Sequence, residues 1–282
     1  MKKYFSFIGL ITIILTSFIL SKKTTLAVKE IDEIMIQIKE NQEKYKQEPQ
    51  DAKIKNNTII PGINGKTVDI EESYKKMKTI GKYNEKYLVY KEQTPQITIE
   101  KQYDKYIISG NETKPTISII FIISDKEIPK KILETLEKNN IQASFFIDTK
   151  WIKNNKQTTK ELLKKGYTIG TIGNNITKKE FKWINDTTKR IGKQKNNYCL
   201  AQEENEENLN ECKQQKNYTI KPIIINSNEP LTEIKKTIKN GSLIALPIND
   251  KTTTELDLII NYINSKAYTI KELQEQLSEK NN

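Results

Sequence analysis

The stretch TISIIFIISDKEIPKKILETLEKNNIQASFFIDTKWIKNNKQTTKELLKKGY, residues 116–167, decides the fold of this 282-residue chain. An apolar run, Ile117 to Ile123, is followed by a polar break and an amphipathic segment from Ile128 to Asn139. A second apolar run, Ala143 to Ile147, precedes a second amphipathic segment, Thr158 to Lys165. The pattern predicts strand, helix, strand, helix. We expect a parallel sheet covered by helices, because a parallel strand reaches its neighbour only through a crossover.

The motifs SIIFIISD, KILETLEKNNIQASFFI and ELLKKGYTIGTIGNN, in this order, resemble the polysaccharide deacetylases, the NodB homology domain. In that family a strand ending in paired aspartates precedes a helix, a strand like ATFF and a segment like GHEIGSHTYSH. The later segments GSLIALPIND and ELDLIINYINSKAYTIKEL resemble the last strand and closing elements of the same family. The resemblance implies an α/β fold, a distorted (β/α) barrel, over residues 114–282. It also implies metal-dependent deacetylation of a cell-wall glycan.

The residues at the family's catalytic positions differ from those that its chemistry requires. The resemblance places the paired aspartates, a general base and a metal ligand, at Ser124 and Asp125. The two metal-binding histidines fall at Ile172 and Ile176, and the histidine that acts as general acid falls at Pro247. The whole chain contains no histidine. We therefore expect no catalytic residues, no bound metal and no cofactor, which describes a pseudoenzyme on the family's scaffold.

A remnant of the substrate groove could still bind glycan or peptidoglycan. The polar residues expected to line it are Asp125, Asn174, Asn175 and Asn249. Two alternatives remain open. One is a divergent deacetylase or other hydrolase that acts on non-peptide carbon–nitrogen bonds of cell-wall polysaccharide with a different base. The other is a structural or protein-interaction module of the cell envelope.

The N-terminal segment MKKYFSFIGLITIILTSFILSKKTTLA predicts export. Two lysines precede an uncharged apolar run, Tyr4 to Leu20, which has the length of a signal sequence or a short membrane anchor. Lys22 and Lys23 follow the run and favour an uncleaved anchor over a cleaved signal. We expect residues 1–27 to hold the protein by a membrane helix at the extracellular face of the membrane, in the cell envelope.

Two further segments separate this N-terminus from the barrel. Residues 28–55 carry apolar residues at helical spacing among many charges, which predicts a helical stalk. Residues 56–113 combine turn pairs with the short runs YLVY, ITI and YIIS and a helical pattern near Glu71 to Met77. This texture predicts a small β-rich domain.

The charge balance is basic, with Lys+Arg 47 against Asp+Glu 36 and a net charge of +11. Such a charge suits anionic surfaces, among them membranes, teichoic-type polymers and nucleic acids. The lysines are scattered, however, and the chain has a single arginine and no basic cluster interleaved with aromatic residues. Together with the secretory N-terminus, this argues against a nucleic-acid partner.

The two cysteines, Cys199 and Cys212, flank the acidic segment AQEENEENLNE. In an exported protein a pair at this spacing predicts a disulfide that fastens a surface loop. A metal site is the alternative, but two thiolates without histidine lack the usual four ligands. We expect the acidic run to be a solvated loop, with a weak calcium site as the alternative.

Overall fold

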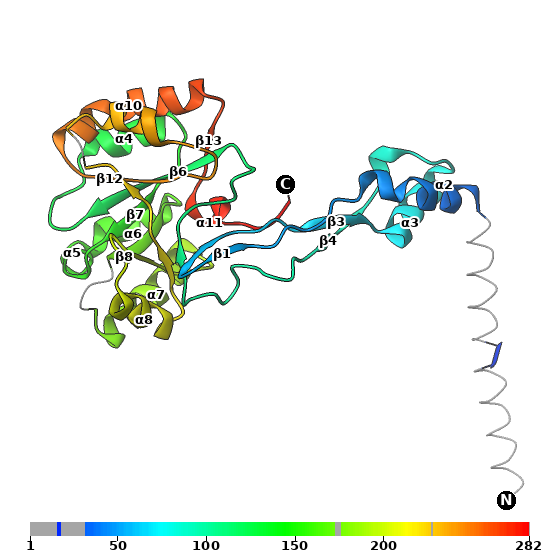
Figure 1. Cartoon of the computed structure of the whole chain (residues 1–282), viewed down its shortest axis with the longest axis horizontal. Coiled ribbons are helices and arrows are strands. Elements are labelled where there is room, and N and C mark those ends of the chain that lie inside the picture. The colour runs from blue at the N-terminus through cyan, green and yellow to red at the C-terminus, as the bar shows by residue number, and fades with distance from the viewer. Residues whose placement is uncertain (1–15, 18–31, 173–175, 227, 282) are drawn as a thin grey trace, which may run out of the picture. The chain divides into compact units, whose positions relative to one another are not determined.

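The structure, a computed structural model, describes residues 16–17, 32–172, 176–226 and 228–281. The chain divides into two compact units, whose elements are labelled in Figure 1. The small unit contains the chain up to Pro49, residues Asn64–Gln93 and Asn281. The large unit contains Gln50–Ile63 and Thr94–Lys280.

The predicted signal sequence or anchor, residues 1–27, lies outside the described residues apart from Thr16 and Ser17. Among the residues that are described, the structure has no helix with the length and apolar character needed to span a membrane.

The small unit is built from two α-helices, two 3-10 helices and one antiparallel pair of strands. Its helix α2 begins after Asp32, whose carboxylate accepts a hydrogen bond from the Ile34 backbone N–H at 3.0 Å. Such side-chain caps satisfy N–H groups that have no partner inside the helix. Helix α3 ends at Gly81, at φ 80°, a conformation that favours glycine. The elements are α2 (Glu33–Asn41), a 3-10 helix (Gln42–Tyr45), β3 (Gly65–Val68), α3 (Ile70–Ile80), a second 3-10 helix (Glu85–Tyr87) and β4 (Tyr90–Gln93).

The apolar side of α2 packs against α3 instead of standing apart as a stalk. One cluster joins Ile34, Met35, Ile38, Val68, Tyr74, Met77 and Leu88. This grouping differs from the expected division into a stalk at 28–55 and a β-rich domain at 56–113. The helical spacing that predicted a stalk is equally the pattern of a helix with one buried face.

Two of the three short strands expected in residues 56–113 are present in part. Tyr90 of YLVY begins β4, and β5 (Tyr106–Ile107) lies in YIIS. The run ITI, residues 97–99, forms no strand. Its Ile97 backbone N–H donates instead to the Asp51 carboxylate at 2.9 Å.

The large unit is organised around a curled, mostly parallel sheet. Its strand order is β1-β2-β5-β10-β9-β8-β7-β6-β12-β11, and β13 also pairs with β6. The pairings are parallel except that of β1 with β2. The strands are β1 (Lys53–Lys55), β2 (Thr58–Ile60), β5, β6 (Thr116–Ile123), β7 (Ser144–Ile147), β8 (Thr168–Ile172), β9 (Tyr198–Leu200), β10 (Tyr218–Ile220), β11 (Ile223–Ile224), β12 (Leu243–Pro247) and β13 (Thr269–Ile270).

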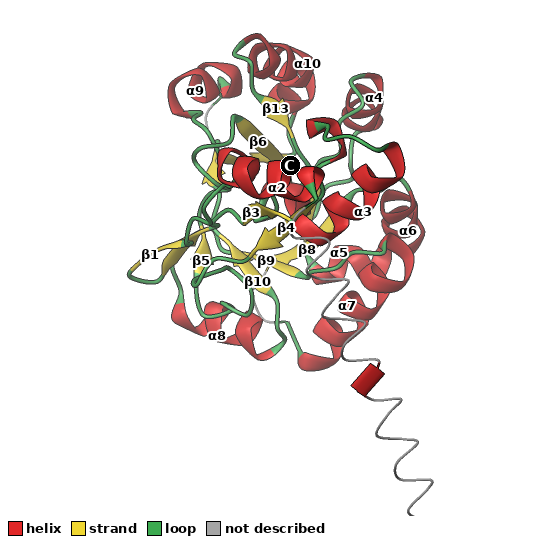
Figure 2. Cartoon of the chain, turned by 90° about the vertical axis from the view of Figure 1, so that its right-hand side faces the viewer, coloured by secondary structure: helices red, strands yellow, loops and turns green. Residues whose placement is uncertain are grey.

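Helices provide the crossovers between these parallel strands and cover the sheet, as Figure 2 shows. They are α4 (Lys130–Lys138), α5 (Thr149–Asn154), α6 (Lys156–Lys164), α7 (Lys178–Gly192), α8 (Glu206–Gln214), α9 (Pro230–Thr237), α10 (Asp250–Ser265) and α11 (Leu273–Gln276). The α/β sheet expected from residues 116–167 is confirmed, and α5 is an additional short helix.

Strand β6 is mainly apolar because both of its faces are buried. Ile119 and Phe121 belong to the cluster that includes Leu136 and Ile260 of the covering helices. Ile120 and its neighbour Ile122 belong to a second cluster, formed with residues of β7, β9 and β10. Side chains alternate between the two faces of a strand, so a centrally placed parallel strand needs apolar residues at successive positions.

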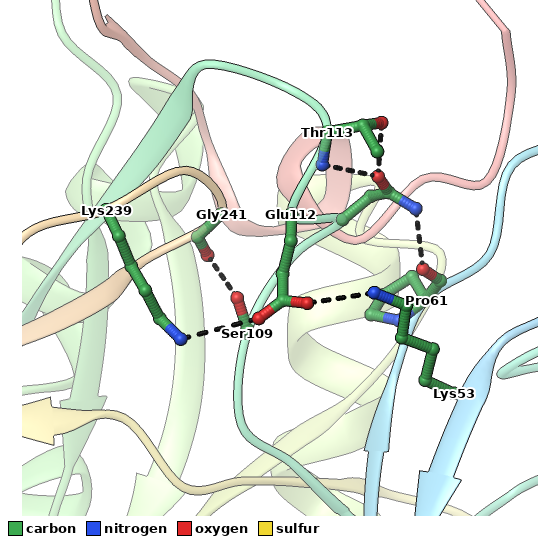
Figure 3. Close-up of polar contacts among 8 residues, drawn as sticks. Lys53, Pro61, Ser109, Glu112, Thr113, Lys239 and Gly241 are labelled. Carbon is green, nitrogen blue, oxygen red and sulfur yellow. Dashed lines mark hydrogen bonds and ion pairs between the residues drawn. The ribbon is translucent and has the colours of Figure 1, made fainter.

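A polar network ties the β1–β2 hairpin to the end of the sheet where β6 and β12 begin (Figure 3). The Glu112 carboxylate pairs with Lys53 at 3.0 Å and with Lys239 at 3.4 Å. Both lysines lower the pKa of the Glu112 carboxyl, and the hydrogen bond from Lys53 makes the largest contribution. The side-chain amide of Asn111 donates to the Pro61 carbonyl at 2.9 Å. These contacts fix the end of the sheet at which β6 and β12 begin, and a cavity lies at the opposite end.

Candidate functional site

The open end of the large unit contains a cavity of about 860 Å³ at the carboxyl ends of the parallel strands. Ligands bind at this edge in open α/β sheets and in barrels, because the loops that follow the strands converge there. The cavity is lined by Ile122, Ile123, Ser124, Asp125, Lys126, Ile172, Leu200, Gln202, Glu203, Asn205, Glu207, Asn208, Glu211, Ile224, Asn226, Pro247 and Ile248.

Ser124 and Asp125 follow β6 directly and lie exposed on the cavity wall. Their loop is held in place by Trp151, whose indole N–H donates to the Lys126 carbonyl at 2.9 Å. Trp151 is itself buried at the start of the crossover after β7. The structure therefore presents a serine and a carboxylate at the edge where the resemblance placed the paired aspartates.

The two isoleucines at the family's histidine positions have different surroundings. Ile172, at the end of β8, is half-buried and lines the cavity. Ile176 is buried among Phe181, Cys199 and Cys212. It lines a separate cavity of about 580 Å³ beside α7 and α8. Only the first of the two positions faces the main cavity.

The predicted groove residues are only partly brought together. Asp125 lines the cavity, and so does Pro247, but Asn249 is not among the lining residues. The Asn249 side chain instead accepts a hydrogen bond from the Thr252 backbone N–H at 2.8 Å and caps α10. An asparagine before a helix commonly serves in this way. Asn174 and Asn175 lie outside the described residues.

One whole wall of the cavity comes from residues whose acidic composition predicted a solvated loop. The segment after Cys199 forms helix α8, capped by Asn205, whose side chain accepts from the Asn208 backbone N–H at 3.0 Å. Leu209 and Cys212 are buried, and Glu207 and Glu211 line the cavity. An asparagine cap, two acidic residues in the first turn and apolar residues three apart would have indicated this helix.

The two cysteines were expected to fasten a surface loop, but they lie at buried positions of a strand and a helix. Cys199 in β9 and Cys212 in α8 are fully buried, and their Cα atoms lie 6.3 Å apart with the sulfur atoms at disulfide-bonding distance. The difference arises because the segment between them folds as a helix against the sheet. The cysteine pair therefore joins the floor of the cavity to its acidic wall.

The cavity residues do not fit the metal that the family scaffold implies. Asp125 is the only inherited ligand, since Ile172 and Ile176 replace the imidazoles and the chain has no histidine. Within the described ranges, no three His, Cys, Asp or Glu side chains are grouped so that they could hold a metal ion. A catalytic zinc site normally has three protein ligands.

Comparison with known proteins finds similarity over part of the chain. A family model described as polysaccharide deacetylase matches residues 109–221. The Bacillus subtilis (strain 168) protein YlxY is 35% identical over 153 residues, which make up 54% of this chain and 48% of YlxY. The matched region thus spans about half the length of that relative.

Solved structures share the fold. Wild-type BA3943 from Bacillus anthracis, described as a CE4 family pseudoenzyme, is 22% identical with a TM-score of 0.63, and the match covers 89% of this chain and 97% of that one. A BA3943 mutant with restored enzymatic activity gives 23% identity and a TM-score of 0.64, covering 89% of this chain and 100% of that one.

The Bc1960 peptidoglycan N-acetylglucosamine deacetylase is 17% identical with a TM-score of 0.52, covering 62% of this chain and 95% of that one. The region matched by the polysaccharide deacetylase family model is the one in which the sequence motifs resemble that family, and the solved structures of CE4 proteins share the fold of this chain.

Proposed function

We propose that this protein is an exported, envelope-associated, polysaccharide-deacetylase-like protein that binds cell-wall glycan without deacetylating it. The observation that carries the proposal is the composition of the cavity at the strand ends. Serine, isoleucine and proline lie where the family's base, metal ligand and acid are implied, and Asp125 alone keeps the implied residue type.

Each replacement removes a different part of the reaction. General acid–base catalysis contributes roughly 10²- to 10⁴-fold per group, and neither Ser124 nor Pro247 can transfer a proton as the implied aspartate and histidine do. Ile172 adds an apolar surface to the wall, which raises the cost of placing a bare cation there. A protein without deacetylase activity is therefore favoured over a divergent hydrolase.

The remaining surface supports a binding role. The cavity offers an apolar floor from Ile122, Ile172 and Leu200, and side-chain amides from Gln202, Asn205 and Asn226. Sugar rings present C–H faces and hydroxyl groups, which match such a combination. The peptidoglycan substrate of the related Bc1960 enzyme adds a specific candidate ligand.

Export and attachment to the membrane are part of the same proposal and rest on the N-terminal sequence. The lysine-flanked apolar run Tyr4 to Leu20 is the supporting feature. It would place the large unit outside the cell, where peptidoglycan is accessible.

A sedimentation assay with purified peptidoglycan tests the proposal. The full-length chain is expected to sediment with the polymer, and Leu200→Trp, which fills the cavity, is expected to remain in the supernatant. Leu258→Trp is the matched control, because Leu258 is the same residue type, 55% exposed on α10 and not part of the cavity. Equal sedimentation of all three proteins, or of none, would contradict glycan binding at this site.

A further inference from the structure

The main cavity is acidic although the protein as a whole is strongly basic. Its lining contains four carboxylates, Asp125, Glu203, Glu207 and Glu211, and one cation, Lys126. The whole chain has a net charge of +11. Within the described residues, none of these four carboxylates takes part in an ion pair. The field in this cavity therefore favours cations and opposes anionic polymers.

A second feature of the same wall points to a ligand with hydrogen-bonding groups. Asn208 lines the cavity and is only 8% exposed. Its side-chain oxygen lies 3.3 Å from Cys212 Sγ, a contact that is a hydrogen bond only when Cys212 carries a proton. Its side-chain NH₂ group has no hydrogen-bond partner among the described residues. The NH₂ nitrogen is not among the buried side-chain atoms that lack a partner, so it is open to solvent and available to donate to a ligand or to water.

The arrangement does not suit a metal ion as the cation. The carboxylates are spread over the loop after β6 and the segment from Glu203 to Glu211, and the described residues contain no cluster that could hold a metal. Separated carboxylates above an apolar floor suit an organic cation, whose charge, hydroxyl groups and C–H surface lie at different points of one molecule.

We propose that the cavity recognises glycan that carries free amino groups, that is, glucosamine units from which the N-acetyl group has been removed. The ammonium group of such a unit pairs with Glu207, and a ring or hydroxyl oxygen accepts from the Asn208 amide. The C–H face of the ring packs on Ile172 and Leu200. This inference rests on the proposed glycan-binding function and specifies its ligand as the product, not the substrate, of an N-deacetylation reaction.

The test compares two oligosaccharides of equal length, the glucosamine hexamer and the N-acetylglucosamine hexamer, by calorimetry on the full-length chain. Both titrations are carried out near pH 6. We expect the glucosamine hexamer to bind at least about tenfold more tightly, which is the effect of one charge-assisted hydrogen bond. Added salt should reduce this preference.

Two variants of adjacent glutamates locate the effect. Glu207→Gln should abolish the preference for the amino form, because Glu207 lines the main cavity. Glu206→Gln should preserve it, because Glu206 lies in the same first turn of α8 but does not line that cavity. The two substitutions remove equal charge at nearly the same distance from the helix N-terminus. Asn208→Leu should weaken binding of both hexamers, and circular dichroism checks that each variant is folded.

The outcomes separate this inference from the proposed function. Tighter binding of the N-acetylated hexamer would overturn the inference and leave glycan binding intact. Failure of both hexamers and of whole peptidoglycan to bind would overturn the proposed function and the inference together. Equally tight binding of a lysine hexamer with the same dependence on Glu207 would show that the cavity recognises charge alone and would also overturn the inference.

Discussion

The hydroxyl of Tyr106 makes two hydrogen bonds with the backbone of Asn205, donating to its carbonyl and accepting from its N–H, both at 2.8 Å. Tyr106 lies in β5 and is 1% exposed, and Asn205 is the residue that caps α8. Burial raises the pKa of the Tyr106 hydroxyl, which therefore stays protonated. A single phenol on one strand thus fixes the start of the helix that forms the acidic wall of the cavity.

Tyr106→Phe should loosen this wall without changing any residue of the cavity. The substitution leaves the two Asn205 backbone groups without their partner, and each net hydrogen bond is worth about 1 kcal/mol. We expect a loss of about 1–3 kcal/mol in the free energy of unfolding and weaker retention on peptidoglycan, measured by urea denaturation and sedimentation. Tyr87→Phe is the control, because Tyr87 is exposed. Unchanged stability of Tyr106→Phe would contradict the role assigned to this phenol.

The cysteine pair should be oxidised in exported protein and should contribute to stability. Closing a loop of this length contributes about 3 kcal/mol in the chain-entropy model. Replacing both Cys199 and Cys212 by alanine is expected to lower the melting temperature and, since the pair joins β9 to α8, to weaken glycan binding as well. Intact-mass measurement decides the first point, and two free thiols in exported protein would disprove the disulfide.

Glu180 makes the stability of the large unit depend on acid pH. Its ion pair with Lys153 and its hydrogen bonds with Thr177, which form the capping box of α7, lower the pKa of Glu180 from 4.5 to about 2. A carboxyl with a lowered pKa stabilises the folded state above its ordinary pKa, and that contribution is lost as the pH falls toward the lowered value. The free energy of unfolding of the wild type should therefore exceed that of Glu180→Gln by about 1 kcal/mol at neutral pH.

This difference in unfolding free energy should shrink between pH 4.5 and about pH 2. Denaturation curves at several pH values measure it. Glu134→Gln is a suitable control, since Glu134 forms an exposed ion pair with Lys130 at 3.1 Å, and such pairs contribute little. A difference that stays constant down to pH 2 would show that the Glu180 carboxylate is not the stabilising species.

Residues 116–167 were sufficient to predict the parallel sheet, because their strands carry an unambiguous local pattern. Phe121 and Phe145 occupy successive buried strands, and their rings stack 5.4 Å apart. Gly166, at φ 85°, follows the end of the preceding helix in a conformation that favours glycine. Gly170 carries a constraint that the pattern could not reveal, since an added Cβ would collide with the ring of Phe146.

The site was predicted less completely, because tertiary contacts decide which polar residues reach the cavity. The side-chain amide of Asn249 is of a type that could bind a ligand in the groove, but it caps helix α10 instead. Ile176 is only four residues from Ile172, yet it packs beside the cysteines in another cluster. The acidic composition of the segment after Cys199 predicts a solvated loop, whereas Leu209 and Cys212 give the segment a buried face.

Localisation is open to a direct test. Cell fractionation should find the full-length chain in the membrane fraction, and protease added from outside should degrade the large unit, because the lysines after the apolar run favour an uncleaved anchor. A version without residues 1–27 should remain inside the cell and serves as the control. Soluble exported protein that begins near Val28 would show that the N-terminal segment is cleaved.

The central claim is that the scaffold has lost its chemistry, and release of acetate from N-acetylated peptidoglycan in the presence of added zinc measures this directly. We expect the wild type to release acetate at the rate of the polymer alone, and Asp125→Ala to be indistinguishable from it. The cavity supplies one carboxylate at the implied metal position, whereas a catalytic zinc normally has three protein ligands. Zinc-dependent turnover by the wild type that Asp125→Ala abolishes would contradict the account.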